Sequence, residues 1–144
     1  MSKQHMFTDA TDALNFILAG KSVFTLVSLK TGTRFTYRVK KKGEVWFVSV
    51  MNGRDNEINY GPLGMIKPDM RFIKTRISEI SETAPCHKAF VWTLVSLITT
   101  KEIPITLQIW HEGKCGVCAR RLTVPTSIEN GIGPECAKKN YRCF

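Results

Sequence analysis

The chain lacks any long apolar run. No stretch of its 144 residues approaches the roughly 20 apolar residues that a membrane-spanning helix needs. The first residues, MSKQHMFTDATDALNF, lack both the apolar segment and the small-residue cleavage site of a signal peptide. We therefore expect a cytoplasmic protein that has no membrane partner and whose cysteines are reduced rather than paired in disulfides.

The sequence also lacks internal repeats, low-complexity tracts and a flexible linker, which argues against a solenoid or a string of hinged domains. Its apolar fraction of 43% and charged fraction of 23% are ordinary for a globular protein. We expect two segments in contact with each other: an α+β domain over residues 1–107 and a zinc-binding module over residues 108–144.

Acidic residues are few: 12 Asp and Glu stand against 21 Lys and Arg, giving a formal net charge of +9. Such an imbalance favours partners that are polyanions or proteins with acidic patches, and it does not choose between them. Nucleic acid and an acidic protein or ribonucleoprotein surface are therefore the partners we consider.

Hydrophobic periodicity predicts the elements of the first segment. Residues 9–19 have the apolar spacing of a short amphipathic helix, which Asp9 or Thr11 can cap. Residues 22–29 and 34–42 are rich in β-branched and aromatic residues and flank a glycine-containing turn, the pattern of a hairpin. Residues 44–51 are apolar at nearly every position, so we expect a central strand covered on both faces.

The remaining predictions complete an α+β fold. We expect an edge strand around residues 58–60, one more short strand within 65–80, and a helix that begins at Pro85 and packs on the sheet. Residues 105–110 then form a strand that leads into the cysteine-rich end. The expected fold is a small antiparallel sheet with two helices, followed by a zinc knuckle and a short helix. Trp46, Trp92 and Trp110 are interpreted as core residues.

Three of the five cysteines lie near a histidine, a pattern that indicates metal before disulfide in a reduced compartment. Cys115 and Cys118 have the two-residue spacing of a zinc knuckle. Cys136 follows Pro134, which places its thiolate in the first turn of a helix, where the positive end of the helix dipole favours it. A tetrahedral zinc needs four protein ligands when its role is structural.

The fourth ligand has two candidates. His111 precedes the knuckle by three residues at the end of a predicted strand, and Cys143 is the penultimate residue. We favour His111, because chain ends are often frayed. Four protein ligands leave no open position for water, so we expect one structural Zn²⁺, no enzyme activity and no small-molecule substrate.

Two groups of basic residues are candidates for nucleic-acid binding. In the strand over 34–42, alternate residues share one face of the strand, and that face can contact phosphates. The other interpretation is a solvated strand face. A second group surrounds the proposed zinc site. The nucleic-acid-binding candidates are Arg34, Arg38, Lys40, Lys42, Arg120, Arg121, Lys138 and Lys139.

The segment WHEGKCGVCARRLTVPTSIENGIGPECAKK resembles a short zinc-binding domain of uncharacterised function that is widespread in bacteriophage and prophage proteins. Its pattern is His, three residues, Cys-x-x-Cys, then Leu-Thr-x-Pro-x-Ser-Ile and Gly-Ile-Gly-Pro-x-Cys. The resemblance implies that the ligands are His111, Cys115, Cys118 and Cys136. One departure is Ala119, where the pattern leads us to expect glycine. The part of the chain from FILAGKSVFTLVSLKTGTRFTYRV through KAFVW also resembles the domain that often accompanies this module in phage proteins.

These features lead to two hypotheses of different classes. The first is a phage-encoded, non-catalytic accessory protein that acts in the host cytoplasm and binds nucleic acid or a nucleic-acid-handling complex. The alternative is a protein-binding inhibitor of a host defence system, similar in action to an anti-CRISPR protein, or of host transcription.

Overall fold

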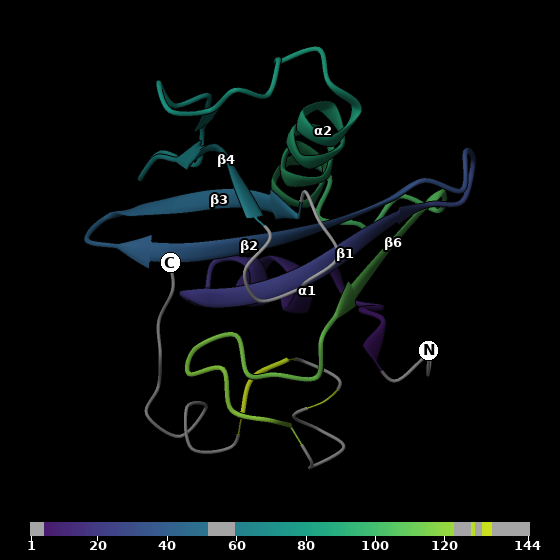
Figure 1. Ribbon diagram of the computed structural model, residues 1–144. Helices are drawn as coiled ribbons and strands as arrows, with labels where there is room; N and C mark the ends of the chain where they lie inside the picture. The colour runs from purple at the N-terminus through teal and green to yellow at the C-terminus, as the bar shows by residue number, and fades with distance from the viewer. Residues whose placement is uncertain (1–4, 52–59, 123–127, 129–130, 134–144) are drawn as a thin grey trace.

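The computed structural model describes residues 5–51, 60–122, 128 and 131–133 (Figure 1). Within these residues, six strands form one antiparallel sheet in the order β5-β4-β3-β2-β1-β6. The predicted α+β class is confirmed. The elements are α1 (Ala10–Ile17), β1 (Lys21–Ser28), β2 (Arg34–Lys42), β3 (Val45–Met51), β4 (Tyr60–Ile66), β5 (Phe72–Ile73), α2 (Pro85–Thr99) and β6 (Leu107–His111).

Helix α1 begins where the sequence predicts it. The Asp9 side chain accepts hydrogen bonds from the backbone N–H groups of Thr11, at 2.7 Å, and Asp12, at 3.4 Å. These bonds satisfy two amides that have no partner inside the helix. The buried side of the helix includes Ala13 and Phe16, so α1 packs against the core through its apolar stripe.

The predicted hairpin forms from β1 and β2, and β3 extends it, with Tyr37 opposite both Phe24 of β1 and Val50 of β3. The expectation that β3 is covered on both faces is wrong. Its residues alternate between buried and more exposed, and Phe47 remains 38% exposed. A run that is apolar at nearly every position can therefore form a strand with only one face in the core.

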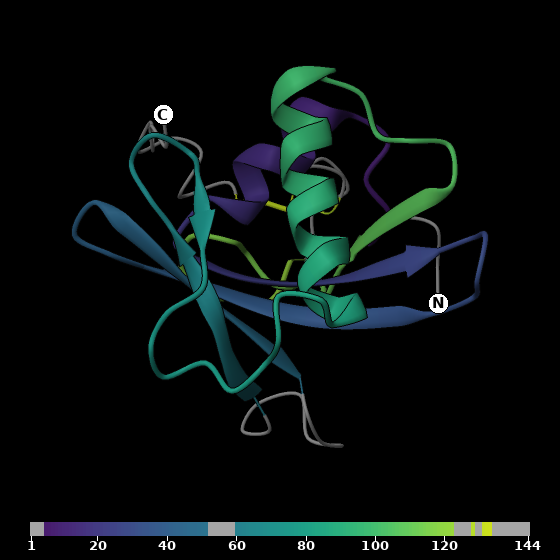
Figure 2. The ribbon, with the colours of Figure 1, turned by 90° about the horizontal axis from the view of Figure 1, so that it is seen from above.

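Both helices lie on the same side of the sheet. The view from above in Figure 2 shows them on the same side of β1 and β2. The core between these layers contains a cluster of aromatic rings. The ring centroid of Tyr37 lies 5.7 Å from that of Phe24 and 5.2 Å from that of Phe90 on α2. The phenol of Tyr37 also donates a 2.6 Å hydrogen bond to the carbonyl of Cys86, which joins β2 to the first turn of α2.

The three tryptophans differ in their surroundings. Trp46 is buried, and its indole N–H donates to the carbonyl of Leu18. Trp110 is half-buried. The interpretation of Trp92 as a core residue is wrong, because it lies on the outer surface of α2 with 47% of its area exposed. Phe90 and Leu94 are the residues that direct α2 onto the sheet.

Strand β6 pairs with β1 and ends at His111. The expected boundary between segments, after residue 107, falls at the first residue of this strand, so most of β6 belongs to the second expected segment. Neither helix in the described part of the chain has the length and apolar character that crossing a membrane requires.

Candidate nucleic-acid interface and cysteine knuckle

Strand β2 presents different chemistry on its two faces. Tyr37 and Val39 point into the core and are fully buried. Arg38 and Lys40 alternate with them and therefore lie on the opposite face, away from the helices. Arg34 and Lys42 share this alternation at the two ends of the strand, and both are exposed. The predicted basic face is thus formed, and we call it the cationic face.

The hairpin register adds a cation that the sequence analysis missed. Lys21 of β1 lies directly opposite Lys40, and Val23 lies opposite Arg38. Directly paired residues of antiparallel strands share one face, so Lys21 joins the cationic face. The signal was available in the sequence, because the short turn between β1 and β2 fixes which residues pair.

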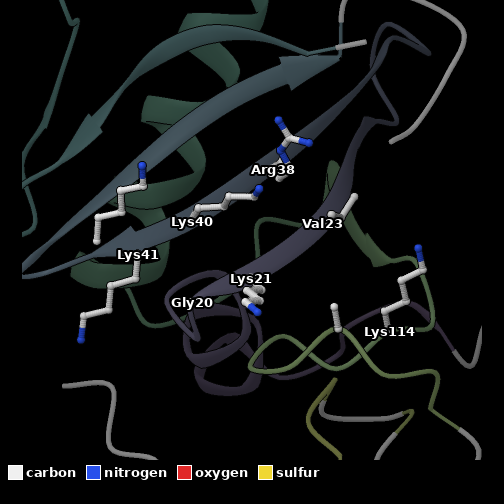
Figure 3. Close-up of a pocket in the computed structure, with 9 residues that line it drawn as sticks. Gly20, Lys21, Val23, Arg38, Lys40, Lys41 and Lys114 are labelled. Atoms are coloured by element: carbon white, nitrogen blue, oxygen red, sulfur yellow. The ribbon is translucent and has the colours of Figure 1, made fainter. Parts of the chain in front are cut away.

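The cationic face is hollowed beside β2. A pocket of about 480 Å³ lies between β1, β2 and the segment after β6, and Figure 3 shows Arg38 and Lys40 on one side of it and Lys114 on the other. Among the described residues that line it are six cations and no carboxylate. The described residues that line the pocket are Gly20, Lys21, Val23, Arg38, Lys40, Lys41, Lys42, Lys114 and Ala119.

A tight loop that we call the cysteine knuckle, residues 113–122, supplies the far wall of this pocket. The Cys115 N–H donates to the Arg120 carbonyl at 2.7 Å, and the Ala119 N–H donates to the Cys115 carbonyl at 2.8 Å. Ala119 has a φ of +66°, a left-handed conformation that favours glycine. The glycine that the resemblance leads us to expect at this position would therefore have a conformational reason.

The sulfur of Cys115 is surrounded by hydrogen-bond donors. It is buried, and it accepts N–H bonds from Gly133 at 3.2 Å and from Val117 at 3.4 Å. Burial alone would raise the pKa of this thiol. The N–H groups of Gly133, Cys118 and Val117, together with the Cys118 thiol, outweigh burial and lower the pKa of Cys115. This is an environment that favours a thiolate, the form that binds metal.

His111 lies at the end of β6 in the core, and its side chain is 1% exposed. Its Nδ1 accepts the Gly113 N–H at 2.9 Å, and its Nε2 is bonded to the carbonyl of Ile128. Since a carbonyl only accepts, Nε2 carries the proton. Burial lowers the pKa of His111, the Ile128 hydrogen bond opposes this, and nearby His5 lowers it further. Both ring nitrogens are therefore engaged.

The described residues bring only part of the predicted zinc site together. Cys115 and Cys118 interact with each other, but no three His, Cys, Asp or Glu side chains of the described ranges form a group that could hold a metal. His111 thus does not complete a group with the two cysteines. Cys136 and Cys143 lie outside the described residues, as do Lys138 and Lys139.

The knuckle is joined to the sheet next to the pocket. The Lys21 N–H donates to the Gly116 carbonyl at 2.7 Å. Within the knuckle, the backbones of Lys114 and Arg121 pair in an isolated antiparallel β-bridge. Arg120 and Arg121 are exposed but do not line the pocket. The knuckle therefore contributes Lys114, rather than the predicted arginines, to the concave part of the cationic face.

In a comparison with known protein families, the carboxy-terminal part of the chain matches a family model. Residues 110–141 fit the pattern of a Family of unknown function (DUF6011). The match begins within β6 and includes the whole knuckle, which is the segment where the sequence resembles a known domain. No curated protein and no solved structure matches the chain.

Proposed function

We propose that this protein is a non-catalytic, phage-encoded accessory protein that binds nucleic acid, directly or as part of a nucleic-acid-handling complex, through its cationic face. The observation that carries the proposal is the concave pocket lined by cations from β1, β2 and the knuckle. Cations that converge on a hollow from three segments can neutralise neighbouring phosphates together, and the release of condensed counterions then favours binding.

We also propose one structural Zn²⁺, held by Cys115, Cys118 and Cys136 with His111 as the fourth ligand. The amide donors around the Cys115 sulfur and the closed backbone of the knuckle support metal binding by the two described cysteines. His111 fits less directly, since ligation through Nε2 requires the bond to the Ile128 carbonyl to be given up. A four-ligand zinc would stabilise the knuckle and hence the Lys114 side of the pocket.

The test of nucleic-acid binding is the salt dependence of affinity, measured by fluorescence anisotropy with a labelled oligonucleotide. The double variant Lys21→Glu, Lys40→Glu should weaken binding and flatten the slope of log K against log salt by about one unit for each lost contact. The matched control is Lys88→Glu, an exposed charge reversal on α2, on the other side of the sheet. Equal affinities and slopes for all three proteins would refute the proposal.

One observation favours the second candidate, an inhibitor that binds a host defence or transcription protein. Trp92 and Val95 are both about half exposed and lie three residues apart on α2, so they share one helix face. Exposed tryptophans are common at the centre of protein interfaces. If this candidate is correct, Trp92→Ala abolishes co-purification with a host protein, whereas the Lys21→Glu, Lys40→Glu variant retains it.

A further inference from the structure

A second hollow lies along the edge of β2 that faces β3, whereas the cationic pocket lies along the edge that faces β1. It encloses about 340 Å³, and apolar side chains form much of its wall. Phe47 is 38% exposed and Ile77 is 71% exposed, so both present apolar surface to solvent. The described residues that line it are Arg38, Lys40, Lys42, Phe47, Val48, Ser49, Pro62, Gly64, Thr75 and Ile77.

Three cations of β2, which we call the cationic ridge, border both hollows: Arg38, Lys40 and Lys42. Residues two apart on a strand are about 6.8 Å apart along the backbone, so the ridge carries cationic side chains at regular backbone intervals. Phe47 lies directly opposite Lys40 in the β2–β3 register. An aromatic ring therefore stands immediately beside the middle of the charged row.

The guanidinium group of Arg38 lies 4.3 Å from the centroid of the Tyr60 ring on β4. This cation–π contact holds the end of Arg38 over the same face as Phe47 and the second hollow. One side of the ridge is thus lined by cations, and the other combines cations with aromatic and apolar surface.

We propose that the ligand of this face is single-stranded nucleic acid, with its backbone in the cationic pocket and a base stacked on Phe47 in the second hollow. This inference rests on the proposed function and specifies its substrate. Single-strand binders combine a cationic groove with aromatic platforms, because unpaired bases expose their ring faces. A duplex buries those faces between neighbouring base pairs, and its cylinder is too wide to enter hollows of this size.

The experiment compares a labelled 12-nucleotide oligothymidylate, its RNA counterpart and a blunt duplex of the same length, at one salt concentration. We expect the wild-type protein to bind at least one of the single strands about tenfold more tightly than the duplex. Phe47→Leu keeps apolar volume but removes the stacking surface. It should weaken binding of the preferred single strand by about tenfold and leave duplex affinity unchanged.

Trp92→Ala is the matched control, since it removes an exposed aromatic residue from α2, on the other side of the sheet; it should leave all affinities unchanged. A circular-dichroism melt confirms that each variant is folded. Equal affinity for single strand and duplex, or an unchanged single-strand affinity in Phe47→Leu, overturns the inference but leaves nucleic-acid binding in place. Failure of the wild-type protein to bind any of the three probes overturns direct nucleic-acid binding by the cationic face as well.

Discussion

The sheet and the cysteine knuckle are stabilised in different ways. In the sheet, large side chains such as Phe24, Tyr37 and Phe90 are almost fully buried between the strands and the helices. The knuckle has few large side chains of its own, and its shape depends on backbone hydrogen bonds such as those of Cys115 and Leu122. One region can fold through extensive hydrophobic burial, whereas the other combines a few buried residues, such as Cys115 and Leu122, with backbone hydrogen bonds and N–H bonds to a sulfur.

This difference shows why the two regions need different support. Burying a large apolar side chain contributes roughly 1.5–3 kcal/mol, so the sheet accumulates stability from its core. A net backbone hydrogen bond contributes only about 0.5–1.5 kcal/mol, and a loop with so few of them is weakly stable alone. A metal bound by the cysteines would supply the additional folding free energy that the knuckle needs. The cationic pocket lies where the two regions meet.

The largest expected effect comes from metal removal. Zinc contributes an apparent ~10–16 kcal/mol to the folding of small zinc peptides, so a chelator should release the knuckle. In hydrogen-exchange mass spectrometry, we expect peptides around Cys115 and Leu122 to lose protection while those around Val39 keep it. Loss of protection in both regions at once would show that they fold as a single unit. Full protection of the knuckle in protein shown to be metal-free would remove the structural role of zinc.

A core truncation should affect the sheet instead. Phe90→Ala removes a buried ring that contacts Tyr37, and such changes typically cost about 3–5 kcal/mol. Urea denaturation followed by tryptophan fluorescence measures this loss. The matched exposed variant, Trp92→Ala, should change stability by less than about 0.5 kcal/mol. Similar costs for the two variants would contradict the orientation of α2.

The smallest effect concerns the backbone of the knuckle and of Gly131, which accepts a hydrogen bond from the knuckle residue Gly116. Ala119→Gly relieves a left-handed conformation at φ +66° and should stabilise the protein by up to about 1 kcal/mol. Gly131→Ala is the opposite change: its φ is +77°, and an added Cβ would lie 2.4 Å from the Cδ1 of Phe16. Thermal melts should therefore rise for the first variant and fall for the second, and the reverse order would contradict the loop geometry.

Local signals predicted most of the helices and strands correctly. The turn between β1 and β2 and Pro85 at the start of α2 each act within a few residues, so sequence alone locates them. The start of α1 was narrowed to a cap at Asp9 or Thr11, and Asp9 is the cap. Burial was harder to predict. Phe47 and Trp92 are as apolar as core residues, and only the packing of the helices on one face decides that they remain exposed.

The candidate site was predicted in part for a similar reason. Alternation along β2 placed Arg38 and Lys40 on one face, and the structure has them there. Lys114 was missed because it reaches the pocket only when the knuckle folds back against β1, which is a contact between segments far apart in the sequence. The engagement of both nitrogens of His111 was equally hidden, since it depends on the position of the Ile128 carbonyl.

The most direct test of nucleic-acid binding by the cationic face is an NMR titration of ¹⁵N-labelled protein with oligothymidylate. Our account predicts that amide shifts change around Lys21, Arg38 to Lys42 and Lys114, the three segments that border the pocket. The amides of α2 around Trp92 should remain at their original positions, since they lie on the opposite side of the sheet. Shifts concentrated on α2, with none at the cationic pocket, would contradict the account.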